Sequence, residues 1–309
     1  MYQTRTIPID HGNSNIKTEH EIFTSGLAES ETVPPTGDYM VFNQRYYTLS
    51  QQRIPYKKDK TTDERFFILT LFGIARELEK SGVPFKEENI HVNLPVGLPP
   101  KHYGILYKKF EQYFKRKGVI EFTYKKRHYS IIIKNVVAYP QAYAAAMTIF
   151  PEIKKHNKVR VVDIGGMSAD YLFLKKGLPD MSVCDTLEYG VIILHNLIKS
   201  KASSDYDILI DDDEIDDIIL NRQTNFHEQF QRMVRNETRN FVEDLLSTLR
   251  ERGLDLRTGL TVFAGGGAKL LKNYIKSSDK VDAILFIEDI KANVLGYKIL
   301  FNLPKVSGR

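Results

Sequence analysis

Two short segments of the sequence share one pattern, an aspartate at the end of an apolar stretch followed two residues later by a glycine. The first opens at Asp10 and reaches Lys17, and the second opens at Asp163 and reaches Asp170, with the same offset of seven. The two aspartates lie about half of the chain apart. This repetition predicts a duplicated architecture in which each half contributes one strand–turn–strand hairpin to a shared site, although two short matches alone leave coincidence open.

The length of the chain agrees with two structural halves. With 309 residues, of which 42% are hydrophobic, the chain exceeds one ordinary core and suffices for two modest domains. Apolar periodicity alternates between strand-like and helix-like segments, which indicates an α/β protein. Strands are expected over 5–9, 16–23, 39–42, 46–49, 90–94, 119–124, 129–137, 159–163 and 170–175. Helices are expected over 62–80, 100–115, 141–150, 187–198, 213–220 and 226–250.

Bulk composition excludes several classes of protein. Cys184 is the single cysteine, so no disulfide forms within the chain, and the N-terminus lacks a secretory signal, which predicts a cytoplasmic location. No apolar run approaches the roughly 20 residues that span a bilayer, so no membrane partner is expected. The net charge of +5 suits an anionic ligand. The basic stretch 108–117 is more typical of a solvated helix face than of a nucleic-acid surface, so direct nucleic-acid binding is not expected.

The first turn has the residues of a phosphate-binding loop. Gly12 permits a tight approach of the backbone, so the amide groups of Gly12, Asn13, Ser14 and Asn15 can face phosphate oxygens. A carboxylate at Asp10 would be repelled by phosphates unless a hydrated cation lay between them, which predicts magnesium. Lys17 on the returning strand can offset charge on the bridging and terminal phosphates.

Two later glycine turns add to this pattern. The second aspartate turn supplies two glycines, a hydroxyl group and another carboxylate; its phosphate-binding candidates are Gly165, Gly166, Met167 and Ser168. The third turn, Gly265, Gly266 and Gly267, follows an apolar strand, and a flat ring or a ribose could lie on its backbone. It matches neither the P-loop nor the dinucleotide-binding fingerprint. Without the other turns, it would be read as an ordinary strand-to-helix connection.

Five motifs in this order resemble the superfamily of actin and heat-shock chaperone ATPases. They are Asp10 to Lys17, Tyr139-Pro140-Gln141-Ala142, Asp163 to Asp170, Gly265 to Lys269 and Ala292-Asn293-Val294-Leu295-Gly296. Within that superfamily, the compact length and the last motif are most similar to bacterial plasmid-segregating actins of the ParM and Alp type. The resemblance implies an actin-like, ribonuclease H-like duplicated ATPase fold with two lobes around a central nucleotide cleft.

The resemblance also implies domain limits. Residues 1–153 would form the first domain, with a peripheral subdomain at about 33–95 and a completing C-terminal helix over 289–309. Residues 154–288 would form the second domain.

The roles of individual residues follow from the same resemblance. Asp10 and Asp163 would hold magnesium through water, both aspartate turns would bind the phosphates of ATP or ADP, and 265–267 would contact adenosine. Gln141 occupies the position that orients the attacking water, a task for which a neutral amide suffices. On its own, this glutamine would be read as a helix-start residue. Asp170 would assist near the water or the metal, and Lys17 would stabilise the phosphates, which completes the catalytic set of Gln141, Asp163, Asp170 and Lys17.

Some residues depart from the family pattern or carry no motif. His11 stands where an apolar or amide residue is common, and Met167 replaces a small hydroxyl residue. His11 is more typical of a structural histidine than of a phosphate ligand. His195 and Cys184 are interpreted as core or surface residues without chemistry. The acidic run 211–217 lacks the calcium-loop pattern and predicts an N-cap for the next helix.

The implied function is an ATPase that polymerises head to tail in a nucleotide-dependent way and segregates plasmids or other DNA. Its partners would be further copies of itself and a DNA-bound adaptor protein, and its cofactors ATP or ADP with magnesium. A heterologous contact that does not close into a ring produces such a filament. A small-molecule kinase of the same superfamily is the first alternative, although the chain has little spare length for a substrate pocket. A non-enzymatic, nucleotide-dependent scaffold is the second.

Overall fold

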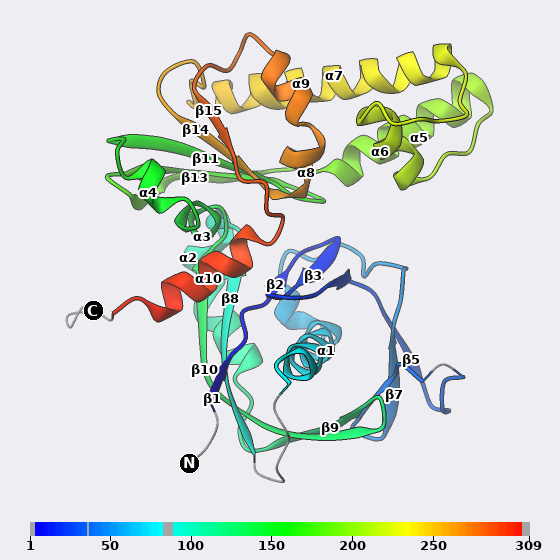
Figure 1. Cartoon of the computed structure of the whole chain (residues 1–309), viewed down its shortest axis with the longest axis vertical. Helices are drawn as coiled ribbons and strands as arrows, with labels where there is room; N and C mark the ends of the chain where they lie inside the picture. Colours follow the sequence, from blue (N-terminus) through cyan, green and yellow to red (C-terminus); the bar gives the residue numbers. More distant parts are fainter. Residues whose placement is uncertain (1–3, 36, 83–88, 305–309) are drawn as a thin grey trace. The chain divides into compact units, whose positions relative to one another are not determined.

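The computed structural model describes residues 4–35, 37–82 and 89–304 of the chain. The chain divides into two compact units (Figure 1). Unit 1 consists of Met1–Thr148 and Lys291–Arg309, and unit 2 of Ile149–Ile290. Each unit combines helices with β-sheet, so the expected α/β class is confirmed.

Unit 1 is built on a seven-stranded sheet with the order β1-β8-β10-β9-β6-β7-β5. Its strands are β1 (Thr4–Thr6), β5 (Leu27–Ser30), β6 (Met40–Phe42), β7 (Arg45–Leu49), β8 (Ile90–Leu98), β9 (Ile120–Tyr124) and β10 (Arg127–Pro140). The pairs β1/β8 and β8/β10 are parallel, and the others are antiparallel. A separate antiparallel sheet contains β2 (Asp10–His11), β3 (Asn15–Lys17) and β4 (Ile22–Thr24). The first aspartate hairpin therefore begins directly after the first strand of the larger sheet.

Helix α1 (Arg65–Lys80) passes through the core of unit 1 (Figure 1). The helix is buried on nearly all sides from Phe66 to Leu78, because both sheets of the unit enclose it. A Cβ atom added at Gly73 would lie 3.1 Å from Ile9 and 3.2 Å from Thr18, so this helix packs closely on the aspartate hairpin. The other helices of the unit are η1 (Lys60–Thr62), α2 (Pro100–Phe114), α3 (Tyr143–Met147) and α10 (Ala292–Asn302).

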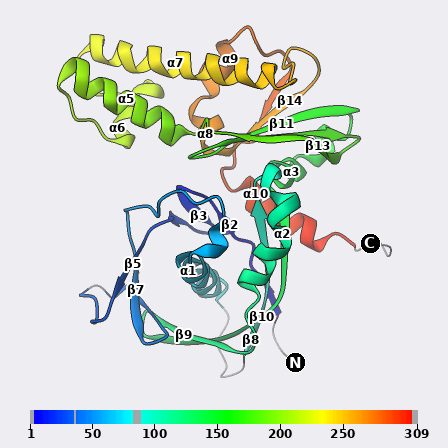
Figure 2. The same cartoon turned by 180° about the vertical axis from the view of Figure 1, so that it is seen from behind.

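Unit 2 contains a five-stranded sheet with the order β13-β12-β11-β14-β15. Its strands are β11 (Lys158–Ile164), β12 (Ala169–Lys175), β13 (Leu178–Leu187), β14 (Thr261–Ala264) and β15 (Ile284–Phe286). Its helices are α4 (Phe150–Ile153), α5 (Val191–Tyr206), α6 (Asp212–Ile219), α7 (Glu228–Glu251), α8 (Gly265–Leu270) and α9 (Lys272–Ser277). The long helix α7 packs against α5, α6 and α9 (Figure 2). Its apolar positions, including Phe230, Phe241 and Leu249, are buried, which confirms their predicted role in the core.

The strand expected over 90–94, which would end just before Pro95, is longer in the structure, because β8 continues to Leu98. The Pro95 carbonyl accepts the N–H of Ile9 at 2.9 Å. The missing N–H of Pro95 interrupts only the edge with β1, where β1 ends at Thr6 and Ile9 forms an isolated bridge to Val96. On the other edge, β10 pairs with β8 to the end of both strands.

Four other expected boundaries were wrong. The strand expected over 16–23 is two strands, because the chain turns at Thr18, whose N–H donates to Glu21 O at 2.9 Å. The helix expected over 141–150 begins only at Tyr143, because β10 continues to Pro140. The helix expected over 187–198 begins at Val191, after the unpredicted strand β13. The helix expected over 289–309 spans Ala292–Asn302, and residues 305–309 lie outside the described ones.

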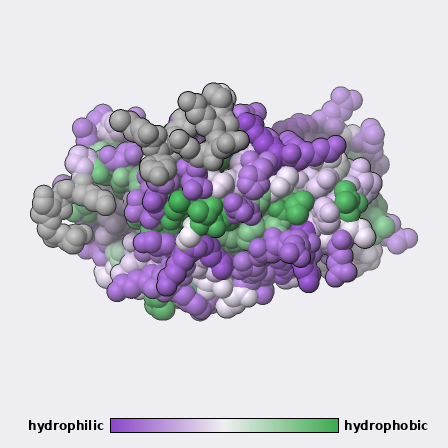
Figure 3. All heavy atoms as spheres, turned by 90° about the horizontal axis from the view of Figure 1, so that it is seen from below, coloured by the Kyte–Doolittle hydropathy of each residue, from purple (hydrophilic) through white to green (hydrophobic). Residues whose placement is uncertain are grey.

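No helix among the described residues is both long enough and apolar enough to cross a bilayer. On the face drawn in Figure 3, hydrophobic residues form small islands surrounded by hydrophilic ones. Scattered apolar residues of this kind are normal on a protein surface.

Candidate active site

The first aspartate hairpin places its two charged residues opposite one another. Asp10 on β2 pairs with Lys17 on β3, and the Lys17 Nζ lies 3.9 Å from Asp10 Oδ2. A Cβ at Gly12 would lie 2.5 Å from the carbonyl oxygen of Asn15, so the turn closes this tightly only with glycine. Within the described part of the chain, the N–H groups of Gly12, Asn13 and Ser14 donate to no protein atom. These are the donors that a phosphate-binding turn requires.

The carboxylate of Asp10 is the centre of a polar cluster in unit 1, and the residue is only 3% exposed. Its Oδ1 accepts a hydrogen bond from Gln141 Nε2 at 2.7 Å and a longer one from the Tyr297 hydroxyl at 3.5 Å. The structure therefore brings Asp10, Lys17 and Gln141, three of the residues predicted from the sequence, to one place. Because a carboxylate only accepts hydrogen bonds, the contact with Asp10 identifies the donor end of the Gln141 amide.

Gln141 is positioned by the end of β10 and by helix α10. Its backbone N–H donates to Leu98 O at 2.8 Å, and the next N–H, of Ala142, donates to Asn293 Oδ1 at 3.1 Å. Ala142 has a φ of 61°, a strained value for a residue with a Cβ. Such strain persists only where surrounding contacts impose it, and here Asn293 supplies one. The start of α3 is thus bent to direct the Gln141 side chain toward Asp10.

Two glycines allow α10 to approach this cluster. A Cβ at Gly97 would lie 1.9 Å from the Tyr297 hydroxyl oxygen, and a Cβ at Gly296 would lie 1.8 Å from the carbonyl oxygen of Ala144. Gly97 therefore makes room for Tyr297 to reach Asp10. Gly296 lets α10 contact the backbone of α3 directly.

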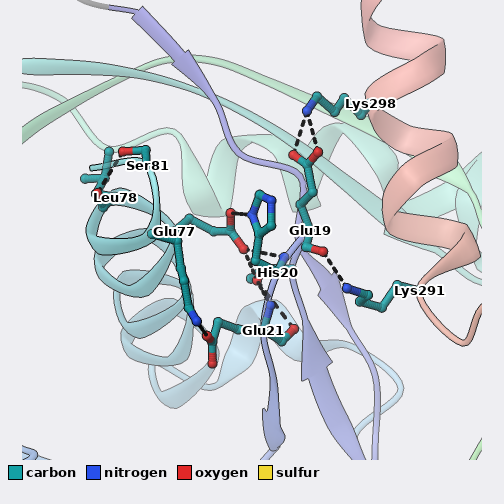
Figure 4. Close-up of polar contacts among 10 residues, drawn as sticks. Glu19, His20, Glu21, Glu77, Leu78, Ser81, Lys291 and Lys298 are labelled. Carbon is teal, nitrogen blue, oxygen red and sulfur yellow. Dashed lines mark hydrogen bonds and ion pairs between the residues drawn. The ribbon is translucent and has the colours of Figure 1, made fainter. Parts of the chain in front are cut away.

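The turn that follows Lys17 is held by helices on both sides (Figure 4). Glu77 on α1 accepts hydrogen bonds from Thr18 Oγ1 at 2.5 Å and from the backbone N–H and Nδ1 of His20, both at 2.7 Å. On the other side, Lys298 of α10 donates to both carboxylate oxygens of Glu19 at 2.6 Å, and Lys291 donates to the Glu19 carbonyl oxygen at 2.6 Å. These contacts fix the end of β3 and with it the position of Lys17.

Glu19, His20 and Glu77 also meet the distance criterion for a metal site, with ligand atoms within 4.8 Å of one another. The Lys298 ammonium already neutralises Glu19, and His20 and Thr18 already satisfy Glu77. A cation here would compete with these contacts. We therefore assign these residues to holding the turn.

The side chain of His11 is buried in unit 1. Its ring stacks on Phe114 with 4.6 Å between centroids, and its Nε2 lies 2.8 Å from Thr70 Oγ1. Because the Thr70 hydroxyl donates to Phe66 O, Nε2–H is the donor to Thr70. Burial, and secondarily the charge of Lys60, lowers the pKa of His11 well below its ordinary value. His11 is thus a neutral residue of the core, as expected.

The second hairpin repeats the geometry of the first inside unit 2. Asp163 on β11 pairs with Asp170 on β12, as Asp10 pairs with Lys17, and the Gly165 N–H donates to Ser168 O at 2.8 Å. Asp163 and Asp170 are both buried, at 6% and 5% exposed. Asp170 accepts a hydrogen bond from the hydroxyl of Thr186 at 2.6 Å. The shared pairing and glycine position support the predicted duplication.

Loop 165–168 rests on the start of α5. The N–H groups of Val191 and Ile192 donate to the carbonyl oxygens of Gly165 and Gly166, at 3.2 and 2.8 Å. A Cβ at Gly190 would lie 2.2 Å from Gly166 O, so this contact needs a glycine. With these carbonyls directed at α5, the N–H groups of Gly166 and Met167 donate to no protein atom in the described part of the chain.

The triple glycine lies beside the second aspartate. The parallel pairing of β11 with β14 places Asp163 opposite Ala264, and 265–267 form the first turn of α8. Gly265 has a φ of 90°, and a Cβ there would lie 2.3 Å from Asp163 Oδ1. A Cβ at Gly266 would meet nothing within 4 Å, so its backbone is open. The structure therefore brings Asp163, Asp170, loop 165–168 and the triple glycine together in unit 2.

The residues present fit magnesium and a nucleotide, the groups implied by the resemblance. Each hairpin combines a buried carboxylate, at Asp10 or Asp163, with backbone N–H groups that have no acceptor among the described residues. Carboxylate oxygens suit magnesium, and backbone N–H groups suit phosphate oxygens. Gln141 stands beside the first carboxylate, where it can also contact a water molecule.

The remaining residues singled out in the sequence have structural roles. His195 is buried, and its Nε2 lies 2.9 Å from Asp216 Oδ1, which joins α5 to α6. Asp211 and Glu214 form a capping box at the start of α6, so the predicted N-cap is confirmed. The Cys184 thiol contacts Met181 O at 3.3 Å on strand β13.

Two models of known protein families match separate parts of the chain. Residues 8–143 match a family model for the N-terminal domain of actin-like proteins, and residues 161–277 match one for the C-terminal part of archaeal MreB-like actin homologues. Both parts of the chain thus match actin homologues, and its fold is actin-like. A search of curated proteins by sequence found no significant match.

Solved structures similar to this actin-like chain cover nearly its whole length. The archaeal actin homologue Ta0583 in complex with ADP matches with a TM-score of 0.73 at 16% identity, covering 96% of this chain and 98% of that one. The apo form of pSK41 ParM matches with a TM-score of 0.69 at 17% identity, covering 97% and 98%. The Alp12 filament structure matches with a TM-score of 0.66 at 15% identity, covering 96% and 98%. The expected actin-like fold and the similarity to the ParM and Alp type are confirmed.

Four residues of the polar clusters around Asp10 and around Asp163 and Asp170 were not identified from the sequence. Gly97 and Tyr297 carry no local signal, because their contact joins a strand to a helix about 200 positions later. Asn293 stood in a recognised motif, but its hydrogen bond to Ala142 is evident only from the fold. Thr186 lies on β13, a strand that the sequence did not indicate.

Proposed function

We propose that this actin-like protein binds Mg-ATP through its two aspartate hairpins and hydrolyses it. The observation that carries this proposal is the 2.7 Å hydrogen bond between Gln141 and Asp10. It joins the residue that the family resemblance assigns to the attacking water with the carboxylate assigned to the metal, although 131 positions separate them in the sequence. Their meeting at a buried, strained junction supports a catalytic role.

Each of these groups would have a separate role in binding and hydrolysis. The N–H groups of 12–14 and of 166–167 donate to phosphate oxygens, and Lys17 adds positive charge where negative charge grows during transfer. Magnesium, when bound near Asp10 and Asp163, supplies neutralisation of the phosphate charge. Because the Gln141 Nε2 is held by Asp10, its Oε1 remains to accept an O–H of the attacking water. Gln141 thus orients the water without removing its proton.

We further propose that the nucleotide controls assembly of this protein into filaments that move DNA. Among the solved structures similar to it, one is a filament, three are named ParM, and one holds ADP. A DNA-bound adaptor protein would be the partner at the cargo. Self-assembly through a heterologous contact requires no second type of subunit.

Two substitutions test the enzymatic part. Gln141→Ala should slow phosphate release by about tenfold or more with ATP affinity nearly unchanged, because only the orientation of water is lost. Asp10→Ala should weaken binding of ATP in the presence of magnesium. Gln229→Ala and Asp279→Ala, at exposed positions on α7 and after α9, are the matched controls and should behave like the wild type. Equal affinity and turnover in all four variants would refute the assignment.

A further inference from the structure

The two most exposed large hydrophobic residues among the described ones are Leu209, at 92%, and Ile105, at 83%. One lies in unit 2 and the other in unit 1. An isolated exposed apolar residue is ordinary. Here, however, the exposed residues near each of them in the sequence carry mainly charges of one sign, and the two signs are opposite.

Ile105 lies on the solvent face of α2. Residues Lys101, Gly104, Ile105, Lys108 and Gln112 recur at helical spacing and are all exposed, while the other side of the helix packs against β8 and β10 (Figure 2). Lys115 and Lys117 follow directly after the helix and are exposed too. We call these seven residues the lysine face. In the described part of the chain, Lys108, Lys115 and Lys117 form no ion pair.

Leu209 lies in the connection from α5 to α6. Its neighbours Ile208 and Ile210 are half-buried and buried, so the chain alternates and directs Leu209 outward. Exposed carboxylates flank it at Asp205, Asp207, Asp213 and Glu214, and we call these four together with Leu209 the acidic face. Across the described residues, none of the four carboxylates forms an ion pair with a lysine or arginine.

The same asymmetry extends to whole units. Unit 1 has 25 lysines and arginines against 15 aspartates and glutamates, a net charge of +10, and unit 2 has 19 against 24, a net charge of −5. Together they give the +5 of the chain. Two lysine faces repel each other, as do two acidic faces, so electrostatics favours a contact between unlike units of different copies.

We propose that the lysine face of one copy docks on the acidic face of a second copy, with Ile105 and Leu209 buried at the centre of the contact. This inference rests on the proposed self-assembly and specifies its surfaces. An apolar residue inside a charged rim is the usual anatomy of an interface. Because the two faces differ, the contact is heterologous and leaves one free face of each kind at the ends, so further copies can add.

Charge reversal tests the proposal. Lys108→Glu with Lys115→Glu should raise the critical concentration for ATP-dependent assembly by about tenfold or more, and so should Asp205→Lys with Asp213→Lys. ATP binding by the unassembled protein should stay unchanged in both. Lys126→Glu with Lys134→Glu, and Glu251→Lys with Asp279→Lys, reverse the same number of exposed charges elsewhere and should assemble normally.

Mixing the two double variants distinguishes contacts between copies from contacts within one. In an equimolar mixture, the intact acidic face of one variant meets the intact lysine face of the other, and the two reversed faces also attract. Assembly should therefore recover in the mixture. Recovery only when all four substitutions occur in one chain would overturn the proposal in favour of a contact within the chain.

The remaining outcomes are equally decisive. Normal assembly of both double variants would refute the proposed surfaces while leaving filament formation intact. Failure of the wild type to assemble with any nucleotide would instead refute the proposed function. If the lysine face binds nucleic acid, Lys108→Glu with Lys115→Glu would abolish binding of a labelled DNA duplex without affecting assembly, which also contradicts the proposal.

Discussion

The close contact between α10 and α3 predicts that an added methyl group at Gly296 lowers the stability of the protein. At Gly296, a Cβ atom would lie 1.8 Å from the carbonyl oxygen of Ala144, 2.2 Å from its carbonyl carbon and 2.8 Å from its Cα. All three atoms belong to the backbone, so no side-chain rotation relieves the overlap. Gly296→Ala must therefore displace α10, which carries Asn293 and Tyr297 of the Asp10 cluster.

Two opposing free-energy terms set the magnitude. Replacing glycine by alanine inside a helix stabilises it by about 1 kcal/mol. Overpacking costs typically about 1–3 kcal/mol, and a backbone clash this close belongs at or above the upper end. We therefore expect a net loss of about 2 kcal/mol, which corresponds to a fall of about 4–8 °C in the Tm of a unit of this size.

Thermal unfolding monitored by circular dichroism measures this difference, and Gly104→Ala is the matched control. Gly104 is also inside a helix, α2, but a Cβ there would meet nothing within 4 Å. That variant should gain about 0.4–1 kcal/mol because only the helix propensity changes. Equal Tm values for Gly296→Ala and Gly104→Ala would refute the reasoning.

Three further predictions concern single side chains. Because the pKa of His11 is lowered in the folded state, the unfolded chain binds a proton at His11 more readily than the folded chain does. As the pH falls below ~6.5, the free energy of unfolding should therefore decrease by up to about 1.4 kcal/mol per pH unit. His11→Leu should flatten this dependence on pH in urea titrations. Asp211→Ala removes the capping box of α6 and should lower stability by about 0.5–2 kcal/mol, whereas an unchanged urea midpoint would contradict the role of the cap. Thr186→Val leaves Asp170 without its 2.6 Å donor and should slow phosphate release; an unchanged rate would remove Asp170 from the mechanism.

Long periodic elements were predictable from the sequence, whereas strands with mixed burial were not. The predicted helix over 226–250 agrees with α7 (Glu228–Glu251) because its apolar positions form one buried stripe. Strand β13 (Leu178–Leu187) escaped prediction because it is an edge strand whose residues are mostly half-buried, so no apolar alternation marks it. The strand end expected before Pro95 was wrong because the missing N–H of a proline interrupts only the edge of the strand that it faces, here the edge of β8 toward β1.

The residues of the candidate site also differ in whether the sequence alone predicts their contacts. Each aspartate hairpin was predictable because all of its parts lie within about eight consecutive residues. The meeting of Gln141 with Asp10 depends on the parallel pairing of β8 with β10, where Pro140 lies opposite Leu98. No local pattern encodes that distance, and the position of Gln141 was anticipated only through family resemblance. Gly97 and Tyr297 lacked even that signal.

Light scattering of the purified protein with ATP, with ADP and without nucleotide, each in the presence of magnesium, tests the central claim most directly when phosphate release is followed in the same sample. We predict assembly with ATP, little without nucleotide, and phosphate release that needs no added acceptor. Scattering that is identical in all three conditions, or turnover only after a sugar is added, would contradict the account of a nucleotide-controlled actin-like ATPase.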